Sequence, residues 1–429
     1  MHSTLQPTTA MNKKSYFLLF LTVIACSCAN KKTSTSYRMP AEWEPQDSLW
    51  MGFRTAERNI SSDSITATDS LTLKLIKEIT VFIPMKLIVE NDSFVHGSKK
   101  IFFDHGIDTT RIDLFIQSPT DFWYRDPGPV FALSDKNELA IADFKYTNYR
   151  NAPQDSISEK AKAQEKIDKN VASRLGIPTI ELKVALEGGS FETNGKGVVI
   201  QNEELTLGRN PRLGKKEIEE DYKKIGISKV IWVKQGLADD AQGEKIGDYY
   251  VWGAGGHTDE FVRFADDSTI LLAWVNDAEK DLNEINKRNR ERMQRDLDVL
   301  QSATDANGKK FRIIKIPLPP LQFQKTIVDS STLKWYNKHG LVIKFNDFIN
   351  EVSCSSYLNF ITTNGLVIIP CYWKPGMPLS FKEADEGAKK IFQQLYQDRK
   401  IMQANPLILN YHAGGMHCIY QPQPRLKKS

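Results

Sequence analysis

Hydrophobic and polar positions alternate along this chain with two different periods, which predict helices and strands that follow one another from end to end. Apolar residues spaced three or four positions apart predict amphipathic helices at residues 67–79, 158–175, 215–225, 277–301 and 381–398. Short apolar runs bounded by turn residues predict strands at residues 85–89, 111–116, 130–133, 197–200, 229–233, 269–272, 311–316 and 366–369. Because the two kinds of element alternate and no linker divides them, we predict a single domain of the α/β class.

Two segments depart from this alternation. Residues 277–301 are dense in Glu, Lys, Arg and Asn, which predicts a solvated surface helix rather than a binding face. Residues 317–350 mix proline, aromatic and polar residues. We interpret them as a long loop, which is either a plain surface excursion or a lid.

The N-terminal apolar run has the length of an export signal and is too short to span a bilayer. Two lysines precede the run at residues 16–25, which ends in Val23-Ile24-Ala25-Cys26, and a polar tract follows. This ending resembles a bacterial lipobox, whose cysteine is lipidated; the alternative is a buried N-terminal strand or helix. We therefore predict a lipoprotein signal peptide over residues 1–25, a tether over residues 26–36, and a lipid anchor on Cys26. The protein is then expected on the bacterial cell envelope, on its periplasmic or outer-surface face.

The composition of the chain limits the kinds of molecule that it is expected to bind. The chain has 429 residues, with 57 Lys and Arg against 53 Asp and Glu, and it has no long basic block. We therefore expect no nucleic-acid partner, and no membrane contact except through the lipid anchor. The predicted folded part, residues 37–425, contains Cys354, Cys371 and Cys418, which form no metal-type pair. A disulfide between Cys354 and Cys371 stays open.

Four motifs place polar residues beside glycine or proline turns. The first contains Trp123-Tyr124-Arg125-Asp126, followed by a Pro-Gly-Pro turn that presents Asp126. In the second, two glycines follow Glu187 and let the backbone approach a ligand closely. The third is His257-Thr258-Asp259, whose outer members would share one face of a strand. The fourth is Gly414-Gly415-Met416-His417-Cys418, where the glycines leave the thiol approachable.

Each motif alone has an ordinary structural explanation, such as a salt-bridged turn, a structural histidine or a small buried cysteine. Together they supply a nucleophile, an acid–base group and three carboxylates, namely Cys418, His257, Asp126, Glu187 and Asp259. A guanidinium group has delocalised charge and planar donors, so paired carboxylates can hold and orient it. The set therefore predicts an enzyme that hydrolyses the guanidinium group of an arginine-like substrate to a ureido group and ammonia.

The four motifs, in this order, resemble those of the agmatine deiminase and bacterial-type peptidylarginine deiminase family. The likeness extends from Arg38 to about Pro424, through an opening at residues 39–45, Arg209-Asn210-Pro211, and a Ser-Tyr-x-Asn-Phe stretch at residues 356–360. It implies the pentein fold, a five-bladed α/β propeller of ββαβ units around a central substrate channel.

The resemblance also implies a role for each motif. Cys418 attacks the guanidinium carbon and forms a covalent thiouronium intermediate, while Asp126 and Asp259 bind the guanidinium nitrogens. His257 protonates the departing ammonia and then activates water. Glu187 pairs with His257 and with substrate nitrogens. Trp123 is a substrate-binding candidate in the same set, and no metal or organic cofactor is implied.

The expected substrate is a peptidyl or C-terminal arginine, which would yield citrulline. Family members that act on agmatine carry an Asn-Ala-Trp-Gly-Gly-like stretch, where this chain has residues 143–150. Arg150 in this stretch is a candidate to hold a substrate carboxylate, although the role of an ordinary surface arginine fits it equally. The export signal also argues against agmatine.

Three alternatives stay open. One is an agmatine deiminase that forms N-carbamoylputrescine for putrescine biosynthesis. Another is a surface lipoprotein that binds cationic peptides without catalysis. The third is a metallohydrolase built on His257, Asp259, His417 and Cys418, whose spacing does not match the usual zinc patterns. The sequence does not determine the oligomeric state.

Overall fold

The computed structural model describes residues 35–55, 65–153 and 156–427. The folded part forms one compact unit, Thr35–Ser429, so the prediction of a single domain is confirmed. The predicted signal peptide, Cys26 and most of the tether lie outside the described residues. Within the part of the chain that the structure describes, no helix combines the length and the apolar character that crossing a membrane requires.

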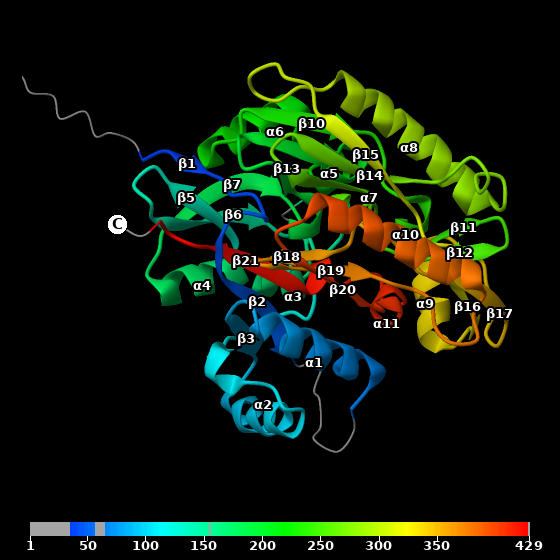
Figure 1. The fold of residues 1–429 in the computed structure, drawn as a ribbon, viewed down its shortest axis with the longest axis horizontal. Coiled ribbons are helices and arrows are strands. Elements are labelled where there is room, and N and C mark those ends of the chain that lie inside the picture. Colours follow the sequence, from blue (N-terminus) through cyan, green and yellow to red (C-terminus); the bar gives the residue numbers. More distant parts are fainter. Residues whose placement is uncertain (1–34, 56–64, 154–155, 428–429) are drawn as a thin grey trace, which may run out of the picture. The chain divides into compact units, whose positions relative to one another are not determined.

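Five of the sheets repeat one pattern, in which two antiparallel strands are followed by a helical connection and a third strand parallel to the second (Figure 1). The first blade consists of β21 (Tyr420–Pro424), β2 (Gln46–Arg54), β3 (Met85–Val89) and β4 (Ile112–Ile116), and the second consists of β1 (Tyr37–Arg38), β5 (Val130–Ser134), β6 (Leu139–Lys145) and β7 (Thr179–Ala185). The third blade consists of β8 (Glu192–Thr193), β9 (Val198–Asn202) and β10 (Lys229–Val233), and the fourth consists of β13 (Val262–Asp266), β14 (Thr269–Trp274) and β15 (Arg312–Pro317). The fifth blade consists of β18 (Ile361–Thr363), β19 (Leu366–Pro370) and β20 (Lys400–Ala404). Because β21 pairs with β2, the first blade takes strands from both ends of the folded chain.

Helices provide the crossover in every blade. They are α1 (Ala67–Thr80) and α2 (Asp92–Asp104) in the first blade, α3 (Glu159–Gln164) and α4 (Ile167–Leu175) in the second, α5 (Glu203–Arg209) and α6 (Lys215–Tyr222) in the third, α8 (Glu284–Ser302) in the fourth and α10 (Leu379–Leu395) in the fifth. Two shorter helices, α7 (Thr258–Phe261) and α11 (Leu407–Asn410), lie in connections between blades. A crossover of this kind is what allows two neighbouring strands to run parallel.

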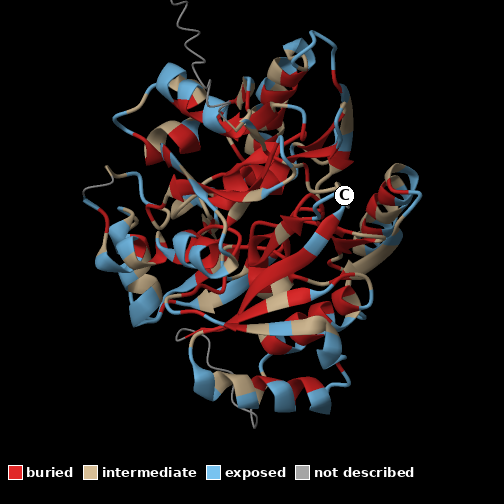
Figure 2. Cartoon of the chain, turned by 90° about the vertical axis from the view of Figure 1, so that its left-hand side faces the viewer, coloured by how far each residue is buried: buried red, intermediate tan, exposed pale blue. Residues whose placement is uncertain are grey.

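Local sequence explains where the helices begin and which face they bury. The Thr66 hydroxyl accepts the backbone N–H of Asp69 at 3.2 Å, and the Asp69 carboxylate accepts the N–H of Thr66 at 2.9 Å, so a capping box starts α1. Leu73, Ile76 and Ile79 of α1 are buried, as their spacing predicts. Burial is greatest on the strands, and the helices expose their outer faces (Figure 2).

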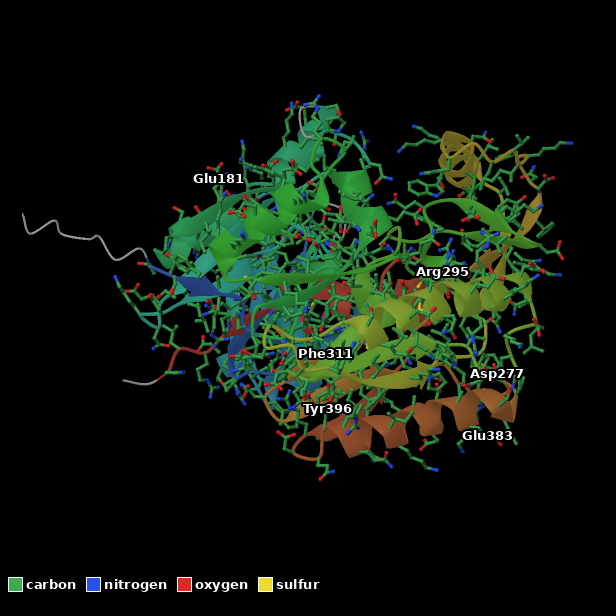
Figure 3. All side chains as sticks on the ribbon, turned by 90° about the horizontal axis from the view of Figure 1, so that it is seen from above. Glu181, Asp277, Arg295, Phe311, Glu383 and Tyr396 are labelled. Atoms are coloured by element: carbon green, nitrogen blue, oxygen red, sulfur yellow. The ribbon has the colours of Figure 1, made fainter. Side chains whose placement is uncertain are left out.

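The largest hydrophobic cluster lies around the fourth blade. Strands β14 and β15 lie between α8 on one side and α10 on the other (Figure 3). Phe311 and Tyr396 belong to this cluster, whereas Arg295 on α8 and Glu383 on α10 are exposed. This packing holds two connections between blades against a rigid core, namely the one that contains α7 and the one that contains α11.

The structure corrects two of the predicted helices. The helix expected at residues 158–175 is divided into α3 and α4 by a break after Gln164. The helix expected at residues 277–301 begins only at Glu284, because the Asn283 side chain accepts the N–H of Asn286 at 2.8 Å and caps it there. This helix is amphipathic rather than wholly solvated, with Met293 among its buried residues.

Residues 317–350 are not the long loop that we predicted. They contain β16 (Phe323–Ile327), α9 (Ser330–Lys338) and the start of β17 (Phe348–Val352). These strands form a sixth sheet with β11 (Glu244–Ile246) and β12 (Tyr249–Val251), in the order β11-β12-β17-β16. We did not predict β16 from the sequence, because the proline-rich start of the segment lies directly before this short strand.

Candidate active site

The candidate catalytic residues lie in the connections that lead from one blade to the next. Asp126 precedes β5, Glu187 precedes β8, and both His257 and Asp259 precede β13. Cys418 precedes β21, the strand that completes the first blade. Because each connection enters its blade at the same point of the repeat, residues far apart in the sequence converge.

Asp126 ends the turn of the first motif, as predicted. The backbone N–H of Asp126 donates to the carbonyl of Trp123 at 3.1 Å. Its carboxylate accepts the backbone N–H of Gly189 on Oδ1 at 3.0 Å and the hydroxyl of Tyr149 on Oδ2 at 2.7 Å. Burial raises the pKa of Asp126, while the nearby His257 opposes this rise.

Gly189 borders a space on which three polar groups converge. A Cβ atom at this position would lie 2.7 Å from His257 Nδ1 and 3.1 Å from both Asp126 Oδ1 and Asp259 Oδ2. Any side chain larger than glycine would therefore enter the space between two carboxylates and an imidazole. The second motif requires glycine here for this close approach.

Glu187 is a buried anion held by a buried cation. Arg209 Nε donates to Oε1 and Oε2 of Glu187 at 2.9 and 3.1 Å, and His257 Nε2 lies 3.8 Å from Oε2. Burial alone would raise the pKa of Glu187, but Arg209 and His257 lower it to about 2. Arg209 belongs to the Arg-Asn-Pro motif, although the sequence did not reveal that it pairs with Glu187.

The third motif is not a strand, contrary to our prediction. Two glycines with φ of +104° and +96° precede His257, which is the N-cap of α7. The buried Asp240 carboxylate accepts the N–H groups of Gly256 and His257, each at 2.8 Å. These bonds fold the backbone into a turn and so favour a helix start over an extended strand. His257 and Asp259 nevertheless both border the space beside Gly189.

Cys418 lies in a short helical turn and is 5% exposed. Its Sγ accepts the N–H of Gly415 at 3.2 Å and the Asn359 side-chain amide at 3.4 Å, and it lies 3.7 Å from Asp259 Oδ2. Asn359 also accepts the N–H of His417 at 2.8 Å. Asn359 comes from the Ser-Tyr-x-Asn-Phe stretch, and its amide fixes the turn that presents the thiol.

The electrostatic field of the site favours a protonated imidazole and a protonated thiol. Burial lowers the pKa of His257, but Asp126 and Glu187 outweigh burial and raise it to about 9. Burial raises the pKa of Asp259 to about 7. Burial, together with Asp259 and other carboxylates, raises the pKa of Cys418 well above its usual range. A cation placed among these carboxylates would reverse the effect on the thiol.

A buried network holds Asp259 from a second direction. His417 Nδ1 lies 2.8 Å from Asp259 Oδ2, and its Nε2 lies 2.9 Å from Glu42 Oε2 and 2.7 Å from Arg125 Nη2. Arg263 Nη2 also donates to Glu42, at 2.7 Å. Burial, Arg125 and Arg263 lower the pKa of His417. The sequence could have indicated Glu42 and His417, because both lie inside motifs that carry the family resemblance.

Of residues 143–150, Tyr149 rather than Arg150 contacts the carboxylates of the site. Asn148 and Tyr149 have φ of +53° and +60°, a left-handed conformation that non-glycine residues rarely adopt. The strained backbone directs the Tyr149 hydroxyl to Asp126, and its ring centroid lies 6.0 Å from that of His257. Arg150 is exposed, and its side chain has no hydrogen bond or ion pair within the described residues. Nothing in the sequence singled out Tyr149.

Trp123 packs against the turn that carries the thiol. A Cβ atom at Gly414 would overlap the indole of Trp123, which is half-buried. Its predicted contact with substrate stays a prediction. Cys354 and Cys371 are both free thiols, so the disulfide that the sequence left open is not formed.

Within the described residues, one set of donor atoms could hold a metal ion. It consists of Asp259, Glu260 and Cys418, whose donor atoms lie within 4.8 Å of one another. The histidines of the metallohydrolase alternative are not part of it. His417 already contacts Asp259 and Glu42 through its two ring nitrogens. The set therefore differs from the nitrogen- and sulfur-rich sites that zinc prefers.

Comparison with known proteins gives a match along the whole folded part. The Porphyromonas-type peptidyl-arginine deiminase family matches residues 38–424. The agmatine deiminase of Pseudomonas syringae pv. syringae is 26% identical over 407 residues, which cover 92% of this chain and 97% of that protein. The agmatine deiminase of Stutzerimonas stutzeri is 27% identical over 395 residues, covering 90% and 95% of the two chains.

Solved structures have the same fold. The agmatine deiminase of Enterococcus faecalis superposes with a TM-score of 0.69 at 24% identity, over 91% of this chain and 96% of that chain. The agmatine deiminase of C. jejuni gives a TM-score of 0.66 at 17% identity, over 92% and 98% of the two chains. The pentein fold that the family resemblance implied is thereby confirmed.

Proposed function

Since this chain belongs to the Porphyromonas-type peptidyl-arginine deiminase family, we propose that it hydrolyses agmatine to N-carbamoylputrescine and ammonia, with Cys418 as the nucleophile. The chain is a hydrolase that acts on a guanidino C–N bond. The alternative of a binding lipoprotein without catalysis is therefore set aside.

One observation carries the proposal, namely the convergence of Asp126, His257 and Asp259 on the space beside Gly189. Two carboxylates can accept hydrogen bonds from different nitrogens of one planar guanidinium group and so fix its plane. Cys418 Sγ lies 3.7 Å from Asp259 Oδ2, close enough to face the central carbon of a group held by that carboxylate. The same geometry suits no anionic substrate.

Substrate charge activates the nucleophile in this scheme. The carboxylates that raise the pKa of the Cys418 thiol are the ones that a guanidinium would neutralise. With the cation bound, the pKa of the thiol falls and its proton leaves, with Asp259 as the nearest acceptor. The thiolate then attacks the guanidinium carbon and forms a C–S bond.

His257 acts in both halves of the reaction. Its pKa of about 9 keeps it protonated near neutral pH, so it can donate a proton to the leaving nitrogen. The C–N bond breaks, ammonia departs and a covalent thiouronium remains on Cys418. Neutral His257 then takes a proton from water, and the hydroxide attacks the same carbon. The C–S bond breaks, the thiolate is restored, and loss of a proton leaves the neutral ureido product.

The charge around the site supports agmatine over a substrate that ends in a carboxylate. The buried arginines of the site are each bound by a glutamate, in the pairs Arg125–Glu42, Arg209–Glu187 and Arg263–Glu192. None of them is left to hold a substrate carboxylate, and a site rich in carboxylates repels one. The relatives named agmatine deiminase match over 90% or more of this chain. We therefore replace our expectation of a peptidyl or C-terminal arginine, with Arg150 as its anchor, by the agmatine alternative.

The test compares ammonia release from agmatine, free arginine and a peptide ending in arginine. Wild type should have its highest kcat/KM on agmatine, which Arg150→Ala should leave unchanged. Cys418→Ala should have no measurable turnover and an unchanged thermal unfolding curve. A preference for the arginyl peptide that disappears in Arg150→Ala would restore the carboxylate anchor. Turnover that chelation abolishes and zinc restores would refute the thiol mechanism.

We further propose that a lipid on Cys26 anchors the enzyme to the bacterial cell envelope. The support is the lipobox-like ending at residues 23–26 and the polar tract behind it. Cys26→Ser should move deiminase activity from the salt-washed membrane fraction to the soluble fraction. Wild-type activity found only in the cytoplasm would contradict the anchor.

A further inference from the structure

On one face of the sheet outside the five blades, Val251 of β12 and Val352 of β17 pack against Ile285 of α8. A second helix covers the other face. Helix α9 covers that face through Tyr336, whose hydroxyl donates to Glu351 on β17 at 3.2 Å and whose ring packs against Tyr250 on β12. Val328, Ile343 and Ile349 complete this small core. Strand β16 forms one edge of the sheet and β11 the other.

Large apolar side chains gather on the opposite face and on the turn beside it. Phe323 and Ile327 of β16 are 48% and 54% exposed, and Phe348 of β17, the cross-strand partner of Ile327, is 71% exposed. The turn before β17 adds Val342 at 92% and Phe345 at 55%. These five make up nearly half of the large exposed hydrophobic residues in the part of the chain that the structure describes. Such clustering marks a contact surface rather than scattered exposure.

Two lysines lie beside these apolar residues, and neither has a carboxylate partner within the described residues. Lys325 lies between Phe323 and Ile327 on the same face of β16, and Lys344 directly precedes Phe345 in the turn; both are exposed. With the two lysines of α9 and two aspartates, the segment 323–348 has a net charge of +2. We call the five apolar residues and these two lysines the apolar–basic surface.

The charge pattern argues against a second copy of the chain as the occupant. Antiparallel pairing of two β16 edges about a two-fold axis would bring Lys325, at the centre of the strand, opposite its own copy. Like charges directly opposite each other destabilise such a pair, and a central lysine is a common means of preventing edge-to-edge association. The surface instead requires a partner that is negatively charged and that accepts aromatic and aliphatic side chains.

We propose that the apolar–basic surface docks the protein on an anionic lipid bilayer. Phe345, Phe348 and Val342 insert at the boundary between headgroups and acyl chains, while the lysines contact headgroup phosphates. A bilayer supplies both chemistries at once over a flat area, which an edge strand and its turn can meet without a preformed groove. The proposal depends neither on the deiminase reaction nor on the lipid on Cys26.

The test uses residues 35–429, which contain the whole compact unit and exclude the predicted signal and lipid site. Sedimentation with phosphatidylcholine vesicles, with and without phosphatidylglycerol, measures binding. Binding should require phosphatidylglycerol, fall with salt and be lost in Phe345→Ser/Phe348→Ser. Lys325→Gln/Lys344→Gln should weaken it roughly 30-fold, from the usual contribution of a basic side chain near an anionic surface. The control Phe103→Ser removes a side chain that is 82% exposed on α2 and should bind as wild type does.

Each other outcome overturns the proposal. Absence of binding to anionic vesicles refutes it, as does binding that the Phe345→Ser/Phe348→Ser variant retains. A concentration-dependent dimer in sedimentation equilibrium that this variant abolishes, without vesicle binding by the wild type, would make the surface an interface between copies. Deiminase activity on a soluble substrate should be equal in all these variants, which separates this test from that of the catalytic site.

Discussion

Replacing Gly189 by alanine tests whether the guanidinium group binds where the three polar groups converge. The added methyl would lie 2.7 Å from His257 Nδ1, several tenths of an ångström inside the 3.4 Å at which ordinary contact begins. The backbone cannot retreat, because the N–H of Gly189 donates to Asp126 at 3.0 Å and its carbonyl accepts the Thr258 hydroxyl at 3.0 Å. Its φ is not positive, so alanine adds no backbone strain.

The displaced group must therefore be the imidazole, a carboxylate or the substrate. A shift of about 1 Å at a reacting group can lower the rate by about 10²-fold, so kcat/KM for agmatine should fall by at least that factor. Overpacking of this size lowers the free energy of unfolding by about 1–3 kcal/mol, which leaves the protein folded. Ammonia release and thermal unfolding measure the two effects.

Gly387→Ala is the matched control. No atom lies within 4 Å of a Cβ at this position on α10. Alanine in a helix interior should stabilise the fold by about 0.5–1 kcal/mol and leave kcat/KM unchanged. If Gly189→Ala kept kcat/KM within about twofold of the wild type, the space beside Gly189 would not be the guanidinium site.

Three further predictions follow from the charges of the site. Tyr149→Phe removes a hydrogen bond that favours the ionised form of Asp126, so the acid limb of the kcat/KM profile should move to higher pH. The value of kcat/KM at neutral pH should fall roughly tenfold. An unchanged pH profile would exclude this role of Tyr149. Arg209→Gln leaves Glu187 buried without its cation and should lower the free energy of unfolding by about 3–5 kcal/mol in urea titrations near neutral pH. Because the pKa of Glu187 is depressed to about 2, its stabilisation is present above the usual carboxyl pKa and is lost as pH falls through about 2, so the deficit of the variant should shrink there. The value of kcat/KM should decline as pH rises through about 9, the pKa of His257 in the free enzyme, since His257 must be protonated to release ammonia, and a kcat/KM that kept rising past this pH would contradict the acid role.

Much of the candidate site could be predicted from the sequence because its chemistry is carried by short motifs. Asp126, Glu187, His257, Asp259 and Cys418 were each singled out by an adjacent glycine or proline turn, and the structure brings all five together. The strands predicted at residues 85–89 and 229–233 coincide with β3 and β10. Such runs are specified by neighbouring residues alone, so they can be predicted without knowledge of the fold.

The parts that were missed depend on residues distant in the sequence. The third motif was expected to be extended, but Asp240 accepts its backbone N–H groups and makes it a helix start. Tyr149 reaches Asp126 only because two consecutive residues adopt a left-handed backbone, which no local pattern predicts. The mixed composition of residues 317–350 concealed β16, which pairs with β17.

The sequence by itself determined the residue types, the order of the motifs and the alternation of strands and helices, because spacing and turn chemistry are local properties. Tertiary structure alone decided the pKa values of the candidate catalytic residues. Arg209 lowers the pKa of Glu187, and the carboxylates of two other connections raise the pKa of His257 to about 9. These shifts arise from burial and from charges a few ångströms apart, and both exist only after β21 pairs with β2 and the five connections meet.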